Sequence, residues 1–478
     1  MAPVAALLAL WALVVACMRQ TGGMLVYSLD DPYIHLALAK NIQQGSYGIN
    51  PGEWASPSSS IAWPFLMALA PARVAEWLPL IINGAACVLT VWCLARVIRR
   101  AGVPAWLPTL GAMAVAFGLN LFGLVMTGME HSLQVLLVVF VAMRLIEQRR
   151  DAWFYVALGL MPLIRYECLA ISLPVGAYLW FTQDKVRPAV AVGVSLAIVV
   201  AFSAFLHAVG LPLLPSSVLA KTLEPPFMTN YTTHPTIVLM LAWLAYAWRD
   251  RLGQWVMLIG LPTLAFMLEG RVGWFGRYEV FILAWLAVFV LASVGDMVLK
   301  AAEGAARAAW AMALSSTALA LAFPTLWQVT LDTPGGCQNV AQQQMVTARI
   351  ARELGMRVAV NDLGLVALRS GQYVLDLAGL ASPEVLEVRR HGQMTGPWID
   401  ELAARKGVEV AFIYDKWFPQ WSRDWILVAS VELLGPKVSA GESSVQLYAR
   451  TPQAAARLHA VAQSMAADPN VPATIRLY

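Results

Sequence analysis

The sequence of 478 residues is poor in charge, since Asp, Glu, Lys and Arg make up 13% of it and hydrophobic residues 59%. A soluble domain usually carries about a quarter charged residues. This deficit, with a mean hydropathy of +0.63, excludes an ordinary water-soluble protein and predicts a polytopic protein whose partner is the lipid bilayer. The net charge of +4 is small for the length and gives no support to nucleic-acid binding.

Residues that bind metals or form disulfides are also scarce. There are six histidines and five cysteines, and no CxxC pair occurs among Cys17, Cys87, Cys93, Cys168 and Cys337. A structural zinc site is therefore not expected. Only Cys337 lies outside the apolar segments and their edges, so the C-terminal part has no partner for an internal disulfide. We interpret the cysteines as small buried apolar residues.

Long apolar runs fill most of the first 330 residues. A membrane-spanning helix needs about 20 apolar residues, and eleven segments qualify as candidates. They are residues 4–26, 76–98, 104–126, 131–147, 152–164, 168–183, 188–209, 235–248, 253–269, 278–298 and 308–328. No Lys or Arg precedes the first run, which predicts an uncleaved transmembrane helix and not a signal peptide. The runs 152–164 and 235–248 are short, so a helix there is either longer than its run or broken.

Basic residues in the connecting loops predict the orientation. Taken alternately, one set of loops holds twelve of them and the other set seven. The richer set is Arg96, Arg99, Arg100, Arg144, Arg149, Arg150, Lys185, Arg187, Arg249, Arg251, Lys300 and Arg307. The poorer set is Arg19, Lys40, Arg73, Arg165, Lys221, Arg271 and Arg277. The positive-inside rule places the richer set and the N-terminus in the cytoplasm, and the C-terminal part outside.

The predicted outer loops are longer than the cytoplasmic turns and mix acids, bases and aromatic residues, so we expect functional sites in them. In the first outer loop, Ile34, Leu38 and Ile42 recur at helical spacing. This spacing predicts an amphipathic helix over 32–44 in the membrane interface, and a second short helix is expected near 61–72.

Beyond about residue 330 the composition changes. Polar helical patterns alternate there with short apolar runs, which are residues 357–361, 373–377, 408–414, 425–431 and 445–449. The alternation predicts an α/β domain large enough for its own core. We therefore divide the chain into a transmembrane domain, residues 1–329, and a C-terminal domain, residues 330–478.

Two adjacent acids, Asp30 and Asp31, directly follow the first apolar run. Such a pair must be solvated, paired or bound to a cation, and like charge raises the pKa of at least one member, which suits a general base. The alternative is a structural helix end, in which Asp31 caps a helix that begins at Pro32. The pair is compatible with a divalent cation and does not require one.

Acidic, basic, hydroxyl and aromatic side chains recur in the later outer loops. They include Glu130, His131, Arg165, Glu167, Ser216, Ser217, Lys221, Trp274, Arg277 and Tyr278. Each has a simpler explanation, such as ordinary loop polarity, an internal Arg165–Glu167 ion pair, or a lysine that snorkels to the interface. Together, however, they supply what transfer from a lipid phosphate needs: cations for the leaving phosphate and a carboxylate for the acceptor proton.

The order of these residues resembles a known family, the GT-C membrane glycosyltransferases, and within it the terminal arabinofuranosyltransferases of mycobacterial cell-wall synthesis. The first outer loop carries the most specific likeness, in Asp30-Asp31-Pro32-Tyr33-Ile34, Ala39-Lys40-Asn41, Gly45, Tyr47, Asn50-Pro51-Gly52-Glu53 and Ser58–Trp63. Later pieces are Thr127-Gly128-Met129-Glu130, Leu214-Pro215-Ser216-Ser217 with Lys221, Gly276-Arg277-Tyr278, Asn361-Asp362-Leu363-Gly364 and Asp376–Leu380.

The resemblance implies a mainly α, polytopic GT-C bundle of about eleven transmembrane helices in a bacterial inner membrane, with an extracytoplasmic C-terminal α/β domain and a periplasmic active site. It implies an inverting transferase of cell-envelope biogenesis. The enzyme would move a sugar, arabinofuranose first, from a polyprenyl phosphate to an extracytoplasmic polysaccharide or protein. Asp30 and Asp31 become the catalytic acids, and Arg165, Lys221 and Arg277 become the donor-phosphate ligands. Substrate contacts are expected from Tyr33, Glu53, Glu130, His131, Glu167, Ser216, Ser217, Trp274 and Tyr278.

Two other functions stay open. A transporter or flippase of a lipid-linked substrate would place ionisable residues near the bilayer midplane, often on broken helices. Here they fall at predicted helix ends, which counts against it. A non-catalytic assembly protein of the cell envelope would use the C-terminal domain as its interaction module and would have no need of the acid pair.

Overall fold

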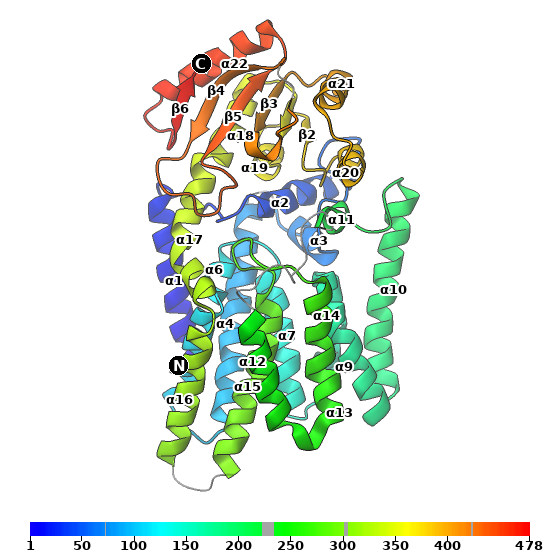
Figure 1. Ribbon diagram of the computed structural model, residues 1–478, viewed down its shortest axis with the longest axis vertical. Coiled ribbons are helices and arrows are strands. Elements are labelled where there is room, and N and C mark those ends of the chain that lie inside the picture. The colour runs from blue at the N-terminus through cyan, green and yellow to red at the C-terminus, as the bar shows by residue number, and fades with distance from the viewer. Residues whose placement is uncertain (72, 222–233, 301–304, 422–423) are drawn as a thin grey trace.

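The computed structural model describes residues 1–71, 73–221, 234–300, 305–421 and 424–478. Its elements form three levels along the long axis of the molecule (Figure 1). A bundle of apolar helices lies below, short helices lie in the middle, and a C-terminal sheet with its own helices lies on top. The two ends of the bundle are therefore unlike, because only one of them is covered.

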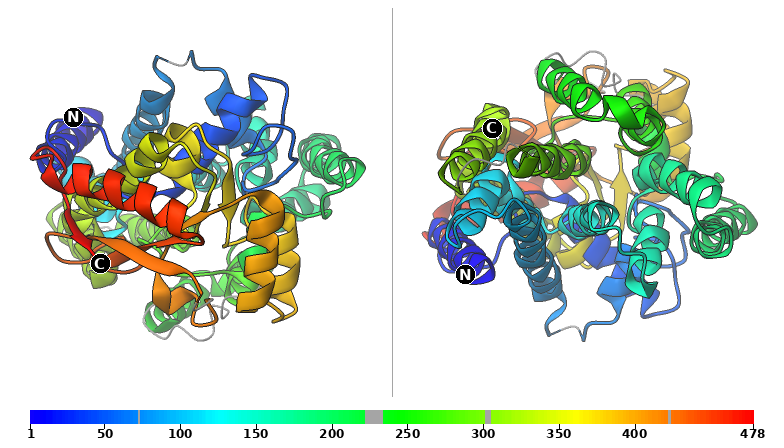
Figure 2. Two further views of the ribbon diagram at one scale, coloured as in Figure 1. Left: turned by 90° about the horizontal axis from the view of Figure 1, so that it is seen from above. Right: turned by 90° about the horizontal axis from the view of Figure 1, so that it is seen from below.

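The bundle consists of apolar helices, most of them longer than ten residues. They are α1 (Ala2–Gln20), α4 (Leu78–Arg99), α5 (Leu107–Gly118), α6 (Leu121–Val125), α7 (His131–Ile146), α8 (Ala152–Ile164), α9 (Leu169–Thr182), α10 (Val186–Ala208), α12 (His234–Ala247), α13 (Leu252–Trp255), α14 (Leu261–Glu269), α15 (Val280–Lys300) and α16 (Ala305–Leu321). The views from above and below place α10 at the rim (Figure 2), and only 17% of its apolar window is buried. The central α15 is 67% buried on the same measure.

By length and composition, five stretches of the described residues can cross a membrane. They are Ala2–Gln20, Ala75–Arg99, Val186–Ala208, Arg249–Leu268 and Val280–Lys300. A sixth forms if α16 and the helix that begins at Pro324, bent by 67° to each other, count as one span. The chain is thus a multi-pass membrane protein. The remaining predicted spans correspond to shorter helices, so the number eleven stays a prediction.

The predicted span 104–126 is broken in the structure, between α5 and α6. Asn120 lies at the break with a φ of 56°, a left-handed conformation that asparagine tolerates better than most residues. Its amide accepts a hydrogen bond from Thr330 Oγ1 at 2.9 Å and donates one to the carbonyl of Phe275 at 3.3 Å. The break therefore ties the bundle to the loop that precedes α15.

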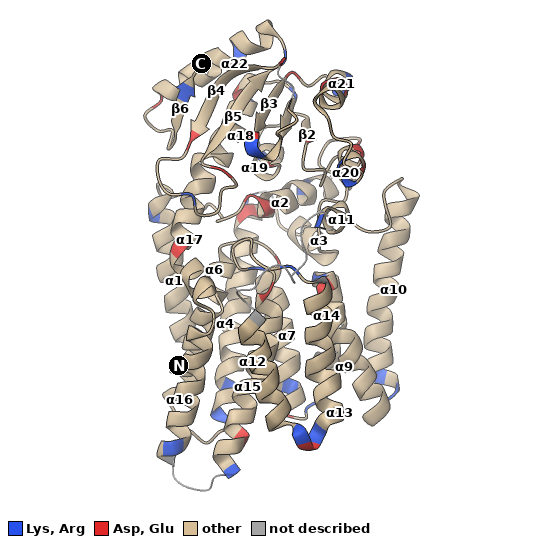
Figure 3. Cartoon of the chain, viewed as in Figure 1, with Lys and Arg blue, Asp and Glu red and all other residues tan. Residues whose placement is uncertain are grey.

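Lys and Arg residues lie at the uncovered end of the bundle, for example at the ends of α13 and α16 (Figure 3). Two acids at this end, Glu147 and Asp151, pair with bases of α4 and α7. Glu147 binds Arg96 and also lies 3.7 Å from Arg144, which binds Asp151 as well. These ion pairs connect the ends of α4 and α7 with the start of α8.

The middle level contains α2 (Asp31–Ile42), α3 (Ala62–Ala68) and α11 (Ser216–Lys221). The helix expected over 32–44 is present, but it is not the half-exposed helix that the amphipathic pattern predicts. All eight residues from Pro32 to Ala39 are buried, because α2 packs between α3 and α19 (Gly364–Arg369) of the C-terminal domain. The apolar stripe of α2 predicted one buried face but not the second, which α19 covers.

The C-terminal domain is a six-stranded mixed sheet of order β2-β1-β3-β5-β4-β6. Its strands are β1 (Val358–Val360), β2 (Val374–Asp376), β3 (Val410–Ile413), β4 (Ile426–Glu432), β5 (Ser444–Ala449) and β6 (Thr474–Leu477). Each of the five predicted runs contains a strand, and β6 was not predicted. The first three strands in chain order are parallel to one another, so their carboxyl ends share one edge.

Helices flank this sheet and connect it to the bundle. They are α17 (Pro324–Gln342), α18 (Gln344–Leu354), α19, α20 (Pro383–Arg390), α21 (Gly396–Lys406) and α22 (Pro452–Ala467). The predicted domain boundary at residue 330 lies inside α17, which runs from the bundle to the sheet (Figure 1). A continuous helix there makes the connection stiff.

The first loop docks on the free edge of β2 through Asn50. Its amide donates to the carbonyl of Val374 and accepts from the N–H of the same residue, both at 2.9 Å. Nearby, Glu53 lies 2.9 Å from Lys406 Nζ and accepts from Tyr373. An edge strand needs such partners for its unpaired backbone groups.

We expect Asn50→Ala to lower the free energy of unfolding by about 1–3 kcal/mol, because it leaves both buried backbone groups of Val374 without partners. The measurement is the Tm of the purified chain in detergent, compared with Asn470→Ala, whose side chain is exposed and bonds only within its own turn. Equal Tm values for both variants would show that the loop is not held by this contact.

Candidate active site

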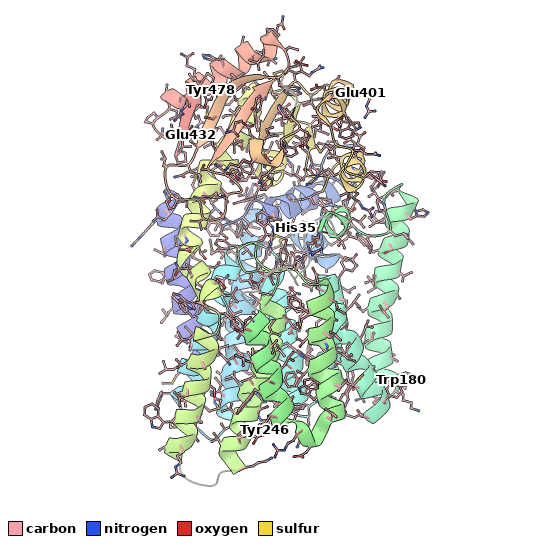
Figure 4. The ribbon with its side chains drawn as sticks, viewed as in Figure 1. His35, Trp180, Tyr246, Glu401, Glu432 and Tyr478 are labelled. Atoms are coloured by element: carbon pink, nitrogen blue, oxygen red, sulfur yellow. The ribbon has the colours of Figure 1, made fainter. Side chains whose placement is uncertain are left out.

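A polar cavity lies between the bundle and the C-terminal domain. Figure 4 shows His35, one of its lining residues, at this middle level. The cavity brings together eight of the predicted site residues: Asp30, Asp31, Arg165, Ser217, Lys221, Trp274, Arg277 and Tyr278. They come from the first loop and α2, the turn after α8, α11, and the loop before α15. Segments far apart in the sequence thus share one site.

Three cations surround the ring of Tyr278. The Cζ of Arg277 lies 4.9 Å from the ring centroid, Lys221 Nζ 5.0 Å and Arg165 Cζ 5.9 Å. An aromatic face attracts cations within about 6 Å. Three like charges at this spacing also repel one another, so acids or an anionic ligand must balance them.

Arg165 is balanced by two acids. Its Nη1 lies 2.8 Å from Glu130 and its Nη2 2.5 Å from Glu167. Burial disfavours ionisation of Glu167, but Arg165 and Lys221 outweigh it and lower the pKa of this carboxyl to about 2. The internal Arg165–Glu167 pair that the sequence left open is therefore present, and Arg165 lines the cavity as well.

Arg277 is balanced by one acid among the residues that the structure describes. Its Nη2 donates to Asp31 Oδ1 at 3.1 Å and to the Tyr278 hydroxyl at 3.0 Å. Its Nε and Nη1 are buried and have no hydrogen-bond partner among the described residues. Burial raises the pKa of the Asp31 carboxyl, but the charge of Arg277 exceeds this effect and lowers the pKa. Asp31 is therefore ionised at neutral pH.

Lys221 is held mainly through its backbone. Arg271 Nη2 donates to its carbonyl at 2.7 Å, while its ammonium lies 3.5 Å from Glu167. Burial and the nearby Arg165 lower the pKa of Lys221 to about 8. This lysine is thus charged at neutral pH and loses its proton just above it. Residues 222–233, which follow Lys221, lie outside the described residues.

Asp30 faces the C-terminal domain. Its two carboxylate oxygens accept from the N–H groups of Gly364 and Leu365, at 2.5 and 2.9 Å, at the start of α19. Burial and the carboxylate of Asp362 raise the pKa of Asp30 to about 8, against these two donors. The structural alternative, in which Asp31 caps α2, is wrong, because α2 has no side-chain cap.

The C-terminal domain completes the cavity at the carboxyl ends of its parallel strands. Asp362 follows β1, Ala378 and Leu380 follow β2, and Trp417 follows β3. In sheets of this kind ligands bind at that edge. Gln344 and Tyr414 donate to the carboxylate of Asp362 at 2.6 and 2.8 Å, so this acid is fixed by its own domain.

Six predicted substrate-binding residues do not line the cavity: Tyr33, Glu53, Glu130, His131, Glu167 and Ser216. Glu130 and Glu167 bind Arg165, and Glu53 is turned away to Lys406. The other three are buried: Tyr33 accepts from the N–H of Tyr27, Ser216 bonds Ser56, and the His131 ring lies 6.1 Å from that of Tyr278. These six residues therefore contact residues around the cavity and do not line it.

The lining residues missing from the predicted set include His35, Asp362 and Trp417. His35 lies one helical turn after Asp31, a spacing that places both on the same face. The motif around Asp362 is part of the family resemblance, which implies no role for this acid. Nothing in the sequence distinguished Trp417 from the other tryptophans.

The residues do not fit a bound metal ion. Among the described residues, no group of three or more His, Cys, Asp or Glu side chains is arranged to hold one. Arg277 occupies one oxygen of Asp31, and backbone N–H groups occupy both oxygens of Asp30. The described residues of the cavity therefore offer no set of ligands for a divalent cation.

Comparison with solved structures shows that this chain shares the fold of ArnT. Two solved structures match over 94% of this chain and 98% of theirs at 12% identity: ArnT from Cupriavidus metallidurans in the apo state, with a TM-score of 0.53, and the same protein bound to undecaprenyl phosphate, with a TM-score of 0.50. Residues 338–448 match a family model described as a domain of unknown function, DUF8728. No curated protein matches the sequence.

We expect Gly364→Ala to destabilise the chain by about 1–3 kcal/mol through overpacking. A Cβ at this position would lie 2.1 Å from the carbonyl oxygen of Asp30, so α19 must move away from the acid pair. Gly193→Ala in α10 is the matched control, since its Cβ would meet no atom within 4 Å. The Tm in detergent and the protease sensitivity of the C-terminal domain are the measurements. A Gly364→Ala chain as stable as the control would contradict the close contact.

Proposed function

We propose that this chain is an integral membrane inverting glycosyltransferase that takes a sugar from a polyprenyl phosphate. One observation carries the proposal: cations gathered at Tyr278 share a cavity with the ionised acid Asp31, at the level where the apolar bundle ends. A lipid phosphate bound in this cavity would place its charge at the end of the bundle and its tail among the apolar helices. The ArnT fold supports this, because one ArnT structure holds undecaprenyl phosphate.

Arg277 and Lys221 are the donor-phosphate ligands in this proposal. Arg277 has two nitrogens without partners among the described residues, and the ammonium of Lys221 has one 3.5 Å contact. Guanidinium and ammonium groups bind phosphate oxygens strongly when partly desolvated. Arg165 adds positive charge near the phosphate. Because it is bound to two acids, it has fewer N–H groups left to bind phosphate oxygens.

Asp31 is the general base. It is ionised, and only its Oδ1 bonds Arg277, so Oδ2 is the oxygen assigned to the acceptor. The acceptor hydroxyl oxygen attacks the anomeric carbon while its proton passes to Asp31. The bond from that carbon to the phosphate oxygen breaks, and the electron pair leaves with polyprenyl phosphate, where Arg277 and Lys221 stabilise it. A single displacement of this kind inverts the anomeric carbon.

Asp30 is a positioning residue in this proposal, because it holds the first loop, which carries Asp31, against the C-terminal domain. Both its oxygens are engaged by the start of α19, so it links the first loop to the C-terminal domain and not to the acceptor. The sugar proposed first is arabinofuranose, on the resemblance of the first loop. The acceptor is an extracytoplasmic polysaccharide or protein, and the covered end of the bundle faces the periplasm of a bacterial inner membrane.

The test is transfer by purified protein from synthetic polyprenyl-phosphate sugars, arabinofuranose first, together with binding of undecaprenyl phosphate. We expect Asp31→Asn to lower the rate by about 100-fold or more by removing the base. Arg277→Gln should weaken lipid-phosphate binding by about tenfold or more. Arg187→Gln, at the uncovered end and 68% exposed, is the control. Unchanged transfer in Asp31→Asn, or no binding of the lipid phosphate by the wild type, would remove the proposal.

The pH dependence follows from Lys221. Because burial lowers its pKa to about 8, the charged form is lost as pH rises through that value, and the transfer rate should fall. Lys221→Arg keeps its charge at every accessible pH, so its rate should stay level to higher pH. An alkaline fall that is identical in both proteins would assign it to another group, for instance Asp30, whose pKa is also raised to about 8.

A further inference from the structure

Two tryptophans from different parts of the chain meet at the cavity. Trp274 comes from the loop before α15, and Trp417 from η6 (Asp415–Trp417), the short helix after β3. Their ring centroids are 6.4 Å apart and their planes lie at 81°. The residues are 44% and 40% exposed. Indole surface left open to water is costly, so such a pair in a polar cavity indicates a ligand that covers it.

Trp417 is fixed by its own domain. Its ring packs against Tyr414 at 5.1 Å, and the hydroxyl of Tyr414 is bonded to Asp362. On another side the backbone of Gly441 lies so close that a Cβ there would be 2.5 Å from Cζ2 of the indole. Any larger residue at 441 would push the ring. The indole is therefore held before any ligand arrives.

Trp274 is fixed by its backbone. It has a φ of 43° and the next residue, Phe275, one of 66°, so two consecutive non-glycine residues are left-handed. This strain persists because the loop is bonded on both sides. The N–H of Gly273 donates to Glu279 at 3.1 Å, and Asn120 donates to the carbonyl of Phe275. Strained backbone held by its surroundings is typical of functional sites.

The chemistry of the surroundings selects the ligand. A sugar ring has an apolar C–H face that stacks on an indole and a rim of hydroxyls that donate to carboxylates. Asp31 and Asp362 line the same cavity as the two indoles. An isoprenoid tail has no hydroxyl groups to donate to these carboxylates, whereas a sugar has several. Tryptophans that anchor a protein in the membrane interface face lipid, whereas these two face the cavity.

We propose that Trp274 and Trp417 form a saccharide subsite that holds a ring of the acceptor glycan beside Asp31. The inference rests on the proposed glycosyltransferase function and deepens it, since it assigns a saccharide acceptor in place of an unglycosylated protein. It also gives the C-terminal domain a direct part in acceptor binding.

The experiment measures binding of soluble tetrasaccharides of arabinofuranose, mannose and glucose to the full chain in detergent, by saturation-transfer NMR and titration. Binding of undecaprenyl phosphate is measured in parallel. We expect Trp417→Ala and Trp274→Ala each to weaken binding of at least one tetrasaccharide by about tenfold or more, with lipid-phosphate binding unchanged. Trp417→Phe should restore part of the affinity. Trp153→Ala, which removes a 72% exposed tryptophan of α8 outside this cavity, should bind like the wild type.

Gly441→Ala gives a second test that keeps both indoles but displaces that of Trp417, together with the Tyr414 ring, from which the new Cβ would lie 2.7 Å. It should weaken tetrasaccharide binding while the Tm shows that the chain is folded. If no tetrasaccharide binds the wild type, or if all bind the alanine variants equally, the saccharide subsite is refuted, whatever the lipid phosphate does. If the sugars bind through the tryptophans but the lipid phosphate does not bind, the proposed donor fails and the subsite stands.

Discussion

The balance of charge around the Tyr278 ring is the constraint on which the rest of the site depends. Three cations near one aromatic face at the end of an apolar bundle are stable only with nearby anions. Glu130 and Glu167 neutralise Arg165, whereas Arg277 has only Asp31 and keeps two unpaired nitrogens among the described residues. This unequal balance leaves donors for one more anion, as the proposed lipid-phosphate site requires.

The C-terminal domain is part of this site and not an appendage to it. The carboxyl ends of its three parallel strands meet at one edge, and that edge faces the cavity with Asp362 and Trp417. Asp30 fixes the domain there, because the start of α19 donates to both of its oxygens. The same contact buries α2, since α19 covers the side that a helix in the membrane interface would expose to water.

Much of the fold follows from local patterns. Apolar runs predicted the bundle helices, and alternating runs predicted five of the six strands, because both depend on which faces must be buried. Two features did not follow. The break at Asn120 depends on partners more than 150 residues away, Thr330 and Phe275. The burial of α2 depends on a helix some 330 residues further along the chain.

The sequence alone determined the class of protein, the GT-C resemblance and most of the charged residues of the site, because composition, periodicity and short motifs are local properties. Only the tertiary structure decided their roles. It separated Asp31, which meets Arg277, from its neighbour Asp30, which meets α19. It also showed that Glu53, predicted to bind substrate, pairs with Lys406 outside the cavity, and that Trp417, which was not predicted, lines the cavity. Contacts between distant segments depend on how helices and strands pack, and no local pattern encodes that packing.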